Sequence, residues 1–105
     1  TVTVAHSRSK DLEKLCLDSD IIISAIGIPE FIKGNMIKKG SSIIDVGITR
    51  VDDLSSPKGY RIVGDVDFKS VSNNVGYITP VPGGVGPMTI AMLLKNTLKA
   101  CEVSD

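Results

Sequence analysis

Apolar and polar positions along the chain follow two patterns that alternate. Runs of β-branched and other aliphatic residues, typical of strands, are separated by segments in which apolar residues recur every three or four positions, as in helices. This alternation predicts crossover units, and therefore an open α/β fold with a mainly parallel sheet and flanking helices. Strands are predicted for residues 1–5, 21–27, 42–47, 61–64 and 77–81. The run at residues 21–27 is almost continuously apolar, so we expect a central strand that is buried on both faces.

Helical patterns lie between and after the predicted strands. Helices are predicted for residues 9–18, 29–40 and 87–102, with a helical turn or two around residues 68–72. Ser9 can cap the first helix, Pro29 suits the start of the second, and Gly40 can end it. The last helix is apolar on more than one side, so we expect it to be buried. Residues 48–60 are mostly polar and rich in turn-forming residues, so they are expected to form a loop.

The composition indicates one small domain with an aliphatic core, because the 105 residues are 42% hydrophobic but only 4% aromatic. Twelve basic residues balance twelve acidic ones, so the chain lacks the positive surplus that attracts nucleic acid or an anionic membrane surface. No apolar run reaches the roughly 18 residues of a membrane span. We therefore expect neither a nucleic acid nor a membrane as a partner.

The residues that ligate metals are few and widely spaced. Cys16 and Cys101 lack the spacing of a redox or zinc motif, and we expect both to be reduced, buried thiols of an intracellular protein. His6 is the only histidine, and a lone histidine at a strand end is more often a solvated loop residue than a ligand or a base. Because a metal site needs three or four ligands, no metal site is expected.

Small residues and glycines follow several of the predicted strands. Residues 24–29 read Ser-Ala-Ile-Gly-Ile-Pro, and residues 45–48 read Asp-Val-Gly-Ile. Open α/β sheets bind ligands at the carboxyl ends of their strands, and small residues there leave room for a flat ligand against the backbone. A nucleotide held by a Rossmann-like sheet is the obvious candidate. Gly27 or Gly47, taken alone, is also explained as a residue that simply ends a strand.

The stretch His-Ser-Arg-Ser after the first predicted strand bears on which nucleotide is bound. Nicotinamide folds that choose NAD place a carboxylate near this point for the ribose 2′-hydroxyl, whereas an Arg accommodates the 2′-phosphate of NADP. Residues 1–10 contain no acid, and Arg8 is available with Ser7 beside it. NADP is therefore favoured over NAD. The usual G-x-G-x-x-G fingerprint is absent, because its nearest match, starting at Gly84, is followed by only one helix and cannot open a βαβ unit. Either the pyrophosphate loop precedes residue 1, or this fold does not bind a dinucleotide.

The stretch PVPGGVGP at residues 80–87 is a rigid and bare loop. Its first two prolines favour an extended backbone, whereas Gly83 and Gly84 remove side chains that would block a close approach. Gly86 is expected to be the N-cap of the last helix, with Pro87 at the first helical position. The loop would then present backbone amides and a helix N-terminus to a ligand above the sheet. The alternative is a tight turn from strand to helix without a binding role.

These stretches together resemble the bifunctional methylenetetrahydrofolate dehydrogenase and methenyltetrahydrofolate cyclohydrolase family. TPVPGGVGPMTIAMLLKNT is similar to the C-terminal signature of that family, and AHSRS, SAIGIPEFI, IKKGSSIIDVGI and RIVGDVDF agree with it in order and spacing. The resemblance implies that residues 1–105 are the NAD(P)-binding domain, in partial form, of a two-domain subunit. The chain also begins within a strand-like stretch and without an initiator methionine. We therefore expect it to be a piece of a longer protein, without the first βα unit and the N-terminal catalytic domain.

The resemblance also implies which residues contact the ligands. The resemblance places Ser7 and Arg8 beside the adenosine 2′-phosphate. It places around the ribose and nicotinamide Ala25, Gly27, Pro29, Gly47 and Ile48, with Thr89 close to the carboxamide. The substrate-binding residues that it places next to both the nicotinamide and the folate are Pro82, Gly83, Gly84 and Val85. The sequence departs from the family at Thr49, where an Asn is usual.

The function implied by the resemblance is the oxidation of 5,10-methylenetetrahydrofolate to 5,10-methenyltetrahydrofolate with NADP⁺, followed by hydrolysis to 10-formyltetrahydrofolate. A Lys paired with a Tyr carries much of this chemistry in the N-terminal domain of the family, and no Tyr-x-x-x-Lys pattern occurs here. We therefore expect no catalytic residue in this chain and no turnover by the chain alone. The whole enzyme is expected to be a homodimer that binds a tetrahydrofolate substrate, in the cytoplasm or, alternatively, in mitochondria.

Two other functions stay open. One is a dehydrogenase of the same fold that acts on another substrate, which the substrate profile of the longer protein would distinguish. The other is a non-catalytic nucleotide-binding or assembly module, against which the Tyr and Lys would argue if the longer protein carries them.

Overall fold

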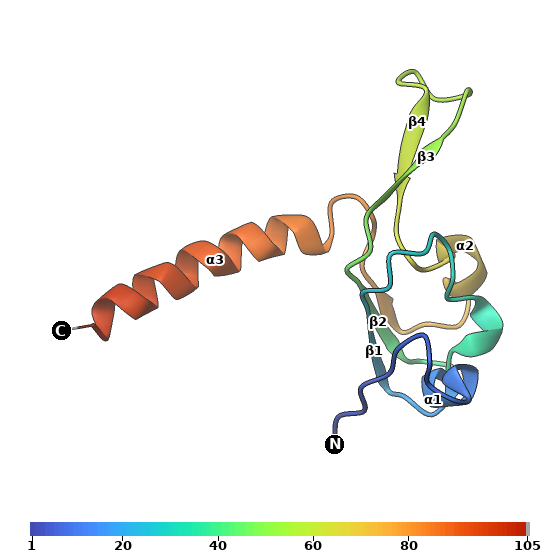
Figure 1. The fold of residues 1–105 in the computed structure, drawn as a ribbon, viewed down its shortest axis with the longest axis horizontal. Coiled ribbons are helices and arrows are strands. Elements are labelled where there is room, and N and C mark those ends of the chain that lie inside the picture. The colour runs from blue at the N-terminus through green and yellow to red at the C-terminus, as the bar shows by residue number, and fades with distance from the viewer. Residues whose placement is uncertain (105) are drawn as a thin grey trace.

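The computed structural model describes residues 1–104, so Asp105, the last residue of the expected domain, lies outside the described residues. Figure 1 shows a small body from which a hairpin and a long helix extend. The elements in chain order are α1 (Leu12–Leu17), β1 (Ile21–Ser24), the 3₁₀ turn η1 (Gly34–Met36), β2 (Ser42–Asp45), β3 (Thr49–Asp52), β4 (Tyr60–Val63), α2 (Phe68–Val71), β5 (Tyr77–Ile78) and α3 (Val85–Glu102).

The body of the molecule is a parallel sheet in the order β1-β2-β5, which confirms the predicted mainly parallel, Rossmann-like sheet with flanking helices. Ile22 pairs with Ile43, and Ile43 pairs with Ile78. The side chains of Ile22 and Ile43 are buried together with Cys16 of α1 and Val71 of α2. The core therefore lies between the sheet and the side that carries α1 and α2 (Figure 1).

Strand β1 is not the doubly buried central strand that the sequence predicts. It ends at Ser24 and lies at one edge of the three-stranded sheet. Ile21 and Ile23, which alternate with the buried positions, are 63% and 68% exposed. Successive side chains of a strand point to opposite faces, so only the face toward α1 and α2 is covered.

The predicted strand at residues 1–5 is wrong for this structure, because those residues form no strand and are exposed. Strand conformation is stabilised by hydrogen bonds to a neighbouring strand. Within residues 1–104, no strand pairs with this segment. A β-branched sequence alone is therefore not enough to form a strand here.

Two of the predicted helices are shorter than expected. The first begins at Leu12, not at Ser9, whose hydroxyl instead accepts from the N–H of His6 at 2.8 Å and closes a turn. Of the helix predicted for residues 29–40, only the turn η1 forms. The N–H groups of Glu30 and Ile32 donate to the carbonyl groups of Gly64 and Asp65 at 3.1 and 2.9 Å, so they are held by another segment and not by a helix.

Residues 48–60 form the predicted loop only in part: residues 53–59 are a turn, but residues 49–52 form a strand. Strand β3 lies within them and pairs with β4 as an antiparallel hairpin, with Thr49 opposite Val63. The guanidinium of Arg50 lies over the ring of Tyr60, with Cζ 3.7 Å from the ring centroid. The turn-forming residues that suggested a loop are therefore the turn of a hairpin that stands away from the body, and Arg50 and Asp52 are exposed positions of its first strand (Figure 1).

No residue of the long helix α3 is buried, and all of its residues from Pro87 onward are exposed, against the prediction that it is buried. It begins at Val85 with Gly84 as its N-cap, so neither Gly86 nor Pro87 has the position expected from the sequence. It extends away from the sheet (Figure 1). The exposed surface of the chain is 7854 Å², whereas a compact protein of 11.1 kDa exposes about 5,700 Å². Apolar side chains that contribute to this excess are Met88, Ile90, Met92, Leu93, Leu94 and Leu98. None of the helices in residues 1–104 is both long enough and apolar enough to span a membrane.

The two cysteines have different surroundings, which corrects the expectation that both are buried. Cys16 of α1 is buried in the core, whereas Cys101 near the end of α3 is exposed. Burial raises the pKa of the Cys16 thiol, and the nearby carboxylate of Glu13 raises it further. The thiolate is the reactive form of cysteine, so Cys16 is protected both by its position and by its protonation state.

We therefore predict that Cys101 reacts rapidly in the folded chain, whereas Cys16 reacts only after unfolding. At pH 8 a disulfide reagent such as DTNB should titrate Cys101 at once and Cys16 only after a denaturant is added, as measured by absorbance and by peptide mass. A Cys101→Ser variant should show no rapid reaction. Rapid reaction of both thiols in the folded chain would contradict the buried position of Cys16.

Candidate functional site

The candidate site lies at the edge where the parallel strands end. Because β1, β2 and β5 run in the same direction, their carboxyl ends meet at one edge of the sheet. Three connections leave this edge: residues 25–29 after β1, residues 46–48 after β2, and residues 79–84 after β5. Open parallel sheets bind ligands at this place, so the geometry agrees with the edge that the sequence singled out.

A cleft of about 520 Å³ opens between the connection after β2 and the start of α3. We call it the apolar cleft, and its lining residues are Asp45, Val46, Gly47, Ile48, Val81, Pro82, Gly83, Val85, Gly86, Pro87, Thr89 and Ile90. It brings together six of the residues proposed from the sequence as ligand contacts, namely Gly47, Ile48, Pro82, Gly83, Val85 and Thr89. The segments that supply them are more than thirty residues apart in the chain.

Gly84 does not line the apolar cleft but shapes the loop beside it. A Cβ atom at Gly84 would overlap the carbonyl oxygen of Pro80, so only glycine fits this turn. Gly83 has a φ of +96°, a left-handed conformation that glycine adopts without strain. At Gly83 and Gly86 a Cβ would meet nothing within 4 Å. The absence of side chains at these two positions therefore leaves open room on the wall of the cleft.

The other residues proposed from the sequence lie outside the apolar cleft. Ala25, Gly27 and Pro29 are exposed in the connection after β1, which leaves the same edge of the sheet. Ser7 and Arg8 are exposed in the turn that precedes α1, where the N–H of Arg8 donates to Nδ1 of His6 at 3.0 Å. The apolar cleft thus brings together six of the residues proposed for the nicotinamide and folate, but not those of residues 25–29, Gly84 or the two proposed for the 2′-phosphate.

The connection after β1 is held by the carboxylate of Asp65, a residue that is completely buried. Its Oδ2 accepts from the N–H of Ile26 at 2.6 Å and from the hydroxyl of Ser24 at 3.2 Å. Its Oδ1 accepts from the N–H of Gly27 at 3.0 Å. A buried carboxylate needs such donors to offset the loss of hydration, and here all three come from residues 24–27.

The second buried carboxylate, Asp45, joins β2 to the segment that carries Asp65. Its Oδ1 accepts from the N–H of Asp65 at 3.1 Å and from that of Gly47 at 2.9 Å. Its Oδ2 accepts from the N–H of Val66 at 3.1 Å, and its own N–H donates to Oγ1 of Thr79 at 2.8 Å. We call Asp45 and Asp65 the carboxylate pair. Together they tie the ends of β1, β2 and β5 to residues 64–66.

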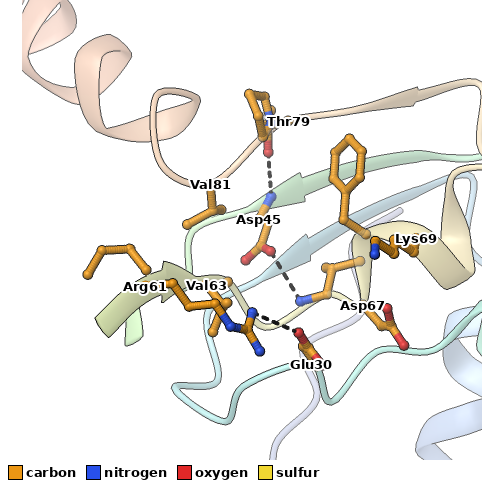
Figure 2. Close-up of a pocket in the computed structure, with 13 residues that line it drawn as sticks. Glu30, Asp45, Arg61, Val63, Asp67, Lys69, Thr79 and Val81 are labelled. Atoms are coloured by element: carbon orange, nitrogen blue, oxygen red, sulfur yellow. Dashed lines mark hydrogen bonds and ion pairs between the residues drawn. The ribbon is translucent and has the colours of Figure 1, made fainter. Parts of the chain in front are cut away.

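A second cleft, of about 720 Å³, lies on the other side of Asp45, between β4, α2 and the connection after β5. Figure 2 shows Glu30, Arg61, Asp67 and Lys69 around it, so we call it the charged cleft. Arg61 pairs with Glu30 at 3.5 Å. These residues come from separate segments, and no local sequence pattern joins them, so the sequence does not predict this cleft.

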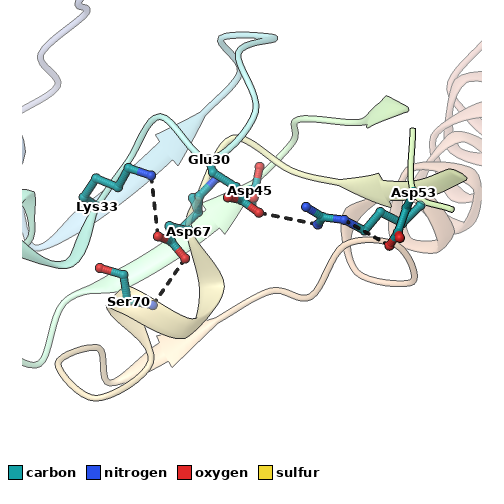
Figure 3. Close-up of polar contacts among 8 residues, drawn as sticks. Glu30, Lys33, Asp45, Asp53, Asp67 and Ser70 are labelled. Atoms are coloured by element: carbon teal, nitrogen blue, oxygen red, sulfur yellow. Dashed lines mark hydrogen bonds and ion pairs between the residues drawn. The ribbon is translucent and has the colours of Figure 1, made fainter. Parts of the chain in front are cut away.

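Two further ion pairs lie on the surface, one between the N-caps of η1 and α2 and one within the hairpin (Figure 3). Lys33 pairs with Asp67 at 3.5 Å, and Arg61 reaches Asp53 at 3.6 Å. The pKa of Asp53 is lowered because Ser55 donates to it from its hydroxyl and its N–H, and the charge of Arg61 acts in the same direction. Exposed pairs of this kind contribute little to stability, so we do not expect the fold to depend on them.

The chemistry available at this edge is binding rather than acid–base catalysis. No group of three His, Cys, Asp or Glu side chains that would hold a metal occurs in the part of the chain that the structure describes. Both buried carboxylates are engaged by N–H and hydroxyl donors. The apolar cleft offers backbone, aliphatic side chains and the hydroxyl of Thr89, which itself donates to the carbonyl of Val85 at 3.0 Å. Such a lining suits a flat, partly apolar ligand.

A parallel sheet whose glycine-rich strand ends border an apolar cleft defines a nucleotide-binding domain of the Rossmann-like class. The comparisons with known proteins agree with this class and make it specific. A family model described as "Tetrahydrofolate dehydrogenase/cyclohydrolase, NAD(P)-binding domain" matches residues 1–105. The chain therefore belongs to the tetrahydrofolate dehydrogenase/cyclohydrolase family, and the resemblance inferred from the sequence is confirmed.

Relatives and solved structures support the same assignment. The chain is 65% identical over 100 residues to the bifunctional protein FolD of Flavobacterium johnsoniae, which covers 95% of this chain and 34% of that protein. Its fold matches the FolD dehydrogenase/cyclohydrolase of Campylobacter jejuni with a TM-score of 0.85 at 50% identity, over 97% of this chain and 34% of that one. The enzyme of Trypanosoma brucei, solved as a complex with NADP cofactor and an inhibitor, also matches with a TM-score of 0.85 at 50% identity, over 99% of this chain and 37% of that one. The chain thus spans about a third of the length of these relatives.

We predict that the carboxylate pair makes glycine indispensable at position 47. A Cβ at Gly47 would overlap the carboxylate of Asp65, so Gly47→Ala should lower the free energy of unfolding by about 2–4 kcal/mol through steric strain and displaced hydrogen bonds. Gly86→Ala is the matched control, because a Cβ there meets nothing within 4 Å. It should be neutral or stabilising by up to about 1 kcal/mol. Urea denaturation followed by circular dichroism measures both, and equal stabilities would contradict the close packing at Gly47.

Proposed function

We propose that this chain is the NADP-binding part of an enzyme that oxidises 5,10-methylenetetrahydrofolate and hydrolyses the methenyl product to 10-formyltetrahydrofolate. The observation that carries the proposal is the apolar cleft at the carboxyl edge of the sheet, in a chain whose whole length matches the family's NAD(P)-binding domain. The NADP complex of the T. brucei relative supports the choice of cofactor.

The apolar cleft suits the nicotinamide half of the cofactor. When bound, the nicotinamide ring supplies the acceptor for the hydride that leaves the folate. Hydride transfer requires the two rings to be held a few ångströms apart. Gly83 and Gly86, which lack side chains on the cleft wall, leave room for this close approach. Val85 and Ile48 supply aliphatic surface that excludes water from the ring.

The adenosine end is assigned to Ser7 and Arg8. Both side chains are exposed in a turn closed by hydrogen bonds between His6 and Ser9. An exposed guanidinium beside a hydroxyl suits a phosphate, because charge-assisted hydrogen bonds to phosphate oxygens are among the stronger ones. Residues 1–10 carry no acidic side chain that would repel the 2′-phosphate. This supports NADP over NAD.

The substrate and the catalytic residues belong, in this proposal, to a second domain of a longer subunit. The chain matches only 34% of the length of the F. johnsoniae relative. Helix α3 leaves apolar residues such as Leu94 and Leu98 uncovered, and a second domain packed on α3 would cover them. The tetrahydrofolate substrate would bind between the two domains, beside residues 82–85 at the start of α3. The whole enzyme is proposed to act as a homodimer in the cytoplasm.

Binding of the cofactor should depend on Arg8. In calorimetric titrations we expect the chain to bind NADP⁺ more tightly than NAD⁺, and Arg8→Ala should weaken NADP⁺ about ten-fold or more while leaving NAD⁺ nearly unchanged. Lys58→Ala, which removes the same charge from the turn of the hairpin, is the control and should leave both affinities unchanged. Equal loss for the two nucleotides, or loss in the control, would contradict a phosphate contact by Arg8.

The chain alone should not catalyse the reaction. With methylenetetrahydrofolate and NADP⁺ present, we expect no increase in the absorbance of NADPH at 340 nm above a blank without protein. The physical reason is that the chain supplies one wall of the cleft but not the Tyr-x-x-x-Lys residues, and the carboxylate of Asp45, which lines the cleft, is already engaged by N–H donors. Measurable turnover by the purified chain would refute the two-domain assignment.

A further inference from the structure

The connection after β1 is exposed but has a defined shape. Ile26 is 41% exposed, and Gly27 has a φ of +84°, with nothing within 4 Å of a Cβ built on it. The backbone conformation of residues 25–27 is therefore not fixed by the packing of side chains against neighbouring segments. What holds them is the carboxylate of Asp65, which receives the consecutive N–H groups of Ile26 and Gly27 on its two oxygens.

Asp65 is well suited to this task, because an ionised carboxylate only accepts hydrogen bonds and can receive two neighbouring N–H groups at once. The residue is completely buried. No lysine or arginine lies within ion-pair distance of it in residues 1–104. The amide and hydroxyl donors therefore supply the stabilisation that a counter-ion would otherwise provide. Their loss would leave a buried charge without partners, which is costly.

Asp45 fixes the position of Asp65 in turn. It accepts from the N–H groups of Asp65 and Val66, and the same carboxylate accepts from Gly47 on the floor of the apolar cleft. Asp45 lines both the apolar and the charged cleft, as Figure 2 shows for the charged one. A displacement at Asp65 would therefore affect the connections after both β1 and β2.

We propose that Asp65 is a positioning residue for the nicotinamide nucleotide, with Asp45 as its support. It does not touch the ligand; it sets the backbone of residues 25–27 against which the ribose and nicotinamide would lie. This inference rests on the proposed function for the identity of the ligand. The hydrogen-bonded shape of the connection does not depend on that identity.

The test is Asp65→Asn, which keeps the shape of the side chain but replaces one acceptor oxygen with an NH₂ donor. That donor would face an N–H of Ile26 or Gly27, so at least one hydrogen bond is lost. We expect NADP⁺ affinity to fall about ten-fold, and the amide hydrogens of Ile26 and Gly27 to exchange with solvent faster by a similar factor in NMR hydrogen exchange.

Two controls separate positioning from general loss of stability. Val71→Ala removes methyl groups from a completely buried core residue of α2 whose backbone hydrogen bonds join it to Asp67, Asn74 and Val75, so it should lower stability while leaving NADP⁺ affinity and both amides unchanged. Asp53→Asn makes the same chemical change at the turn of the hairpin and should alter neither readout. If Val71→Ala weakened NADP⁺ as much as Asp65→Asn, the positioning role would be overturned.

The two readouts also distinguish this inference from the proposed function. If the unaltered chain binds no NADP⁺, the proposed function of this chain fails, and amide exchange alone decides the positioning role. If Asp65→Asn leaves the exchange of Ile26 and Gly27 unchanged, the positioning role is wrong whatever the affinity. If Asp65→Asn does not fold, Ser24→Ala takes its place, since it removes one donor to Asp65. Faster exchange at the two amides would then support the inference, and unchanged exchange would overturn it.

Discussion

Two carboxylates buried without a cation are the constraint on which the edge of this sheet depends. Asp45 and Asp65 are 4% and 0% exposed, and each accepts three hydrogen bonds from backbone or hydroxyl donors. Because these donors come from the connections after β1 and β2 and from residues 64–66, the pair makes one rigid unit of segments far apart in the chain. It also requires glycine at positions 47 and 64, where a Cβ would overlap the carboxylates.

The arrangement explains how so small a core can support a binding site. Within residues 1–104 seven hydrophobic residues are buried in one cluster, and the hairpin and α3 extend beyond this core (Figure 1). The shape of the site is therefore fixed by hydrogen bonds at the strand ends and by the glycine-rich loop before α3 more than by packing of side chains. A domain that binds a cofactor for a partner domain needs a firm edge toward the ligand and a surface left open to that partner, and both features are present here.

The sequence predicts part of this structure well, and the errors have physical causes. The strands at Ile22 and Ile43 follow from continuous β-branched runs, and the site loop follows from glycines and prolines, which act locally. The predictions of a strand at residues 1–5 and of a buried α3 are wrong, because strand pairing and burial depend on neighbouring segments that a local sequence pattern does not reveal. The hairpin was missed because its outward positions are polar. Asp65 was missed because its partners Ile26 and Gly27 lie 39 and 38 positions away, although an Asp next to apolar residues in VGDVD was a usable signal.

The central claim is that a nicotinamide nucleotide binds at the carboxyl edge of the parallel sheet. The most direct test is a titration of the ¹⁵N-labelled chain with NADP⁺, followed by the NMR shifts of its backbone amides. The account predicts that the shifts concentrate at residues 25–27, 46–48 and 83–89, with smaller changes at residues 7–8. Shifts confined to the charged cleft around Arg61 and Lys69, or no shifts at saturating NADP⁺, would contradict it.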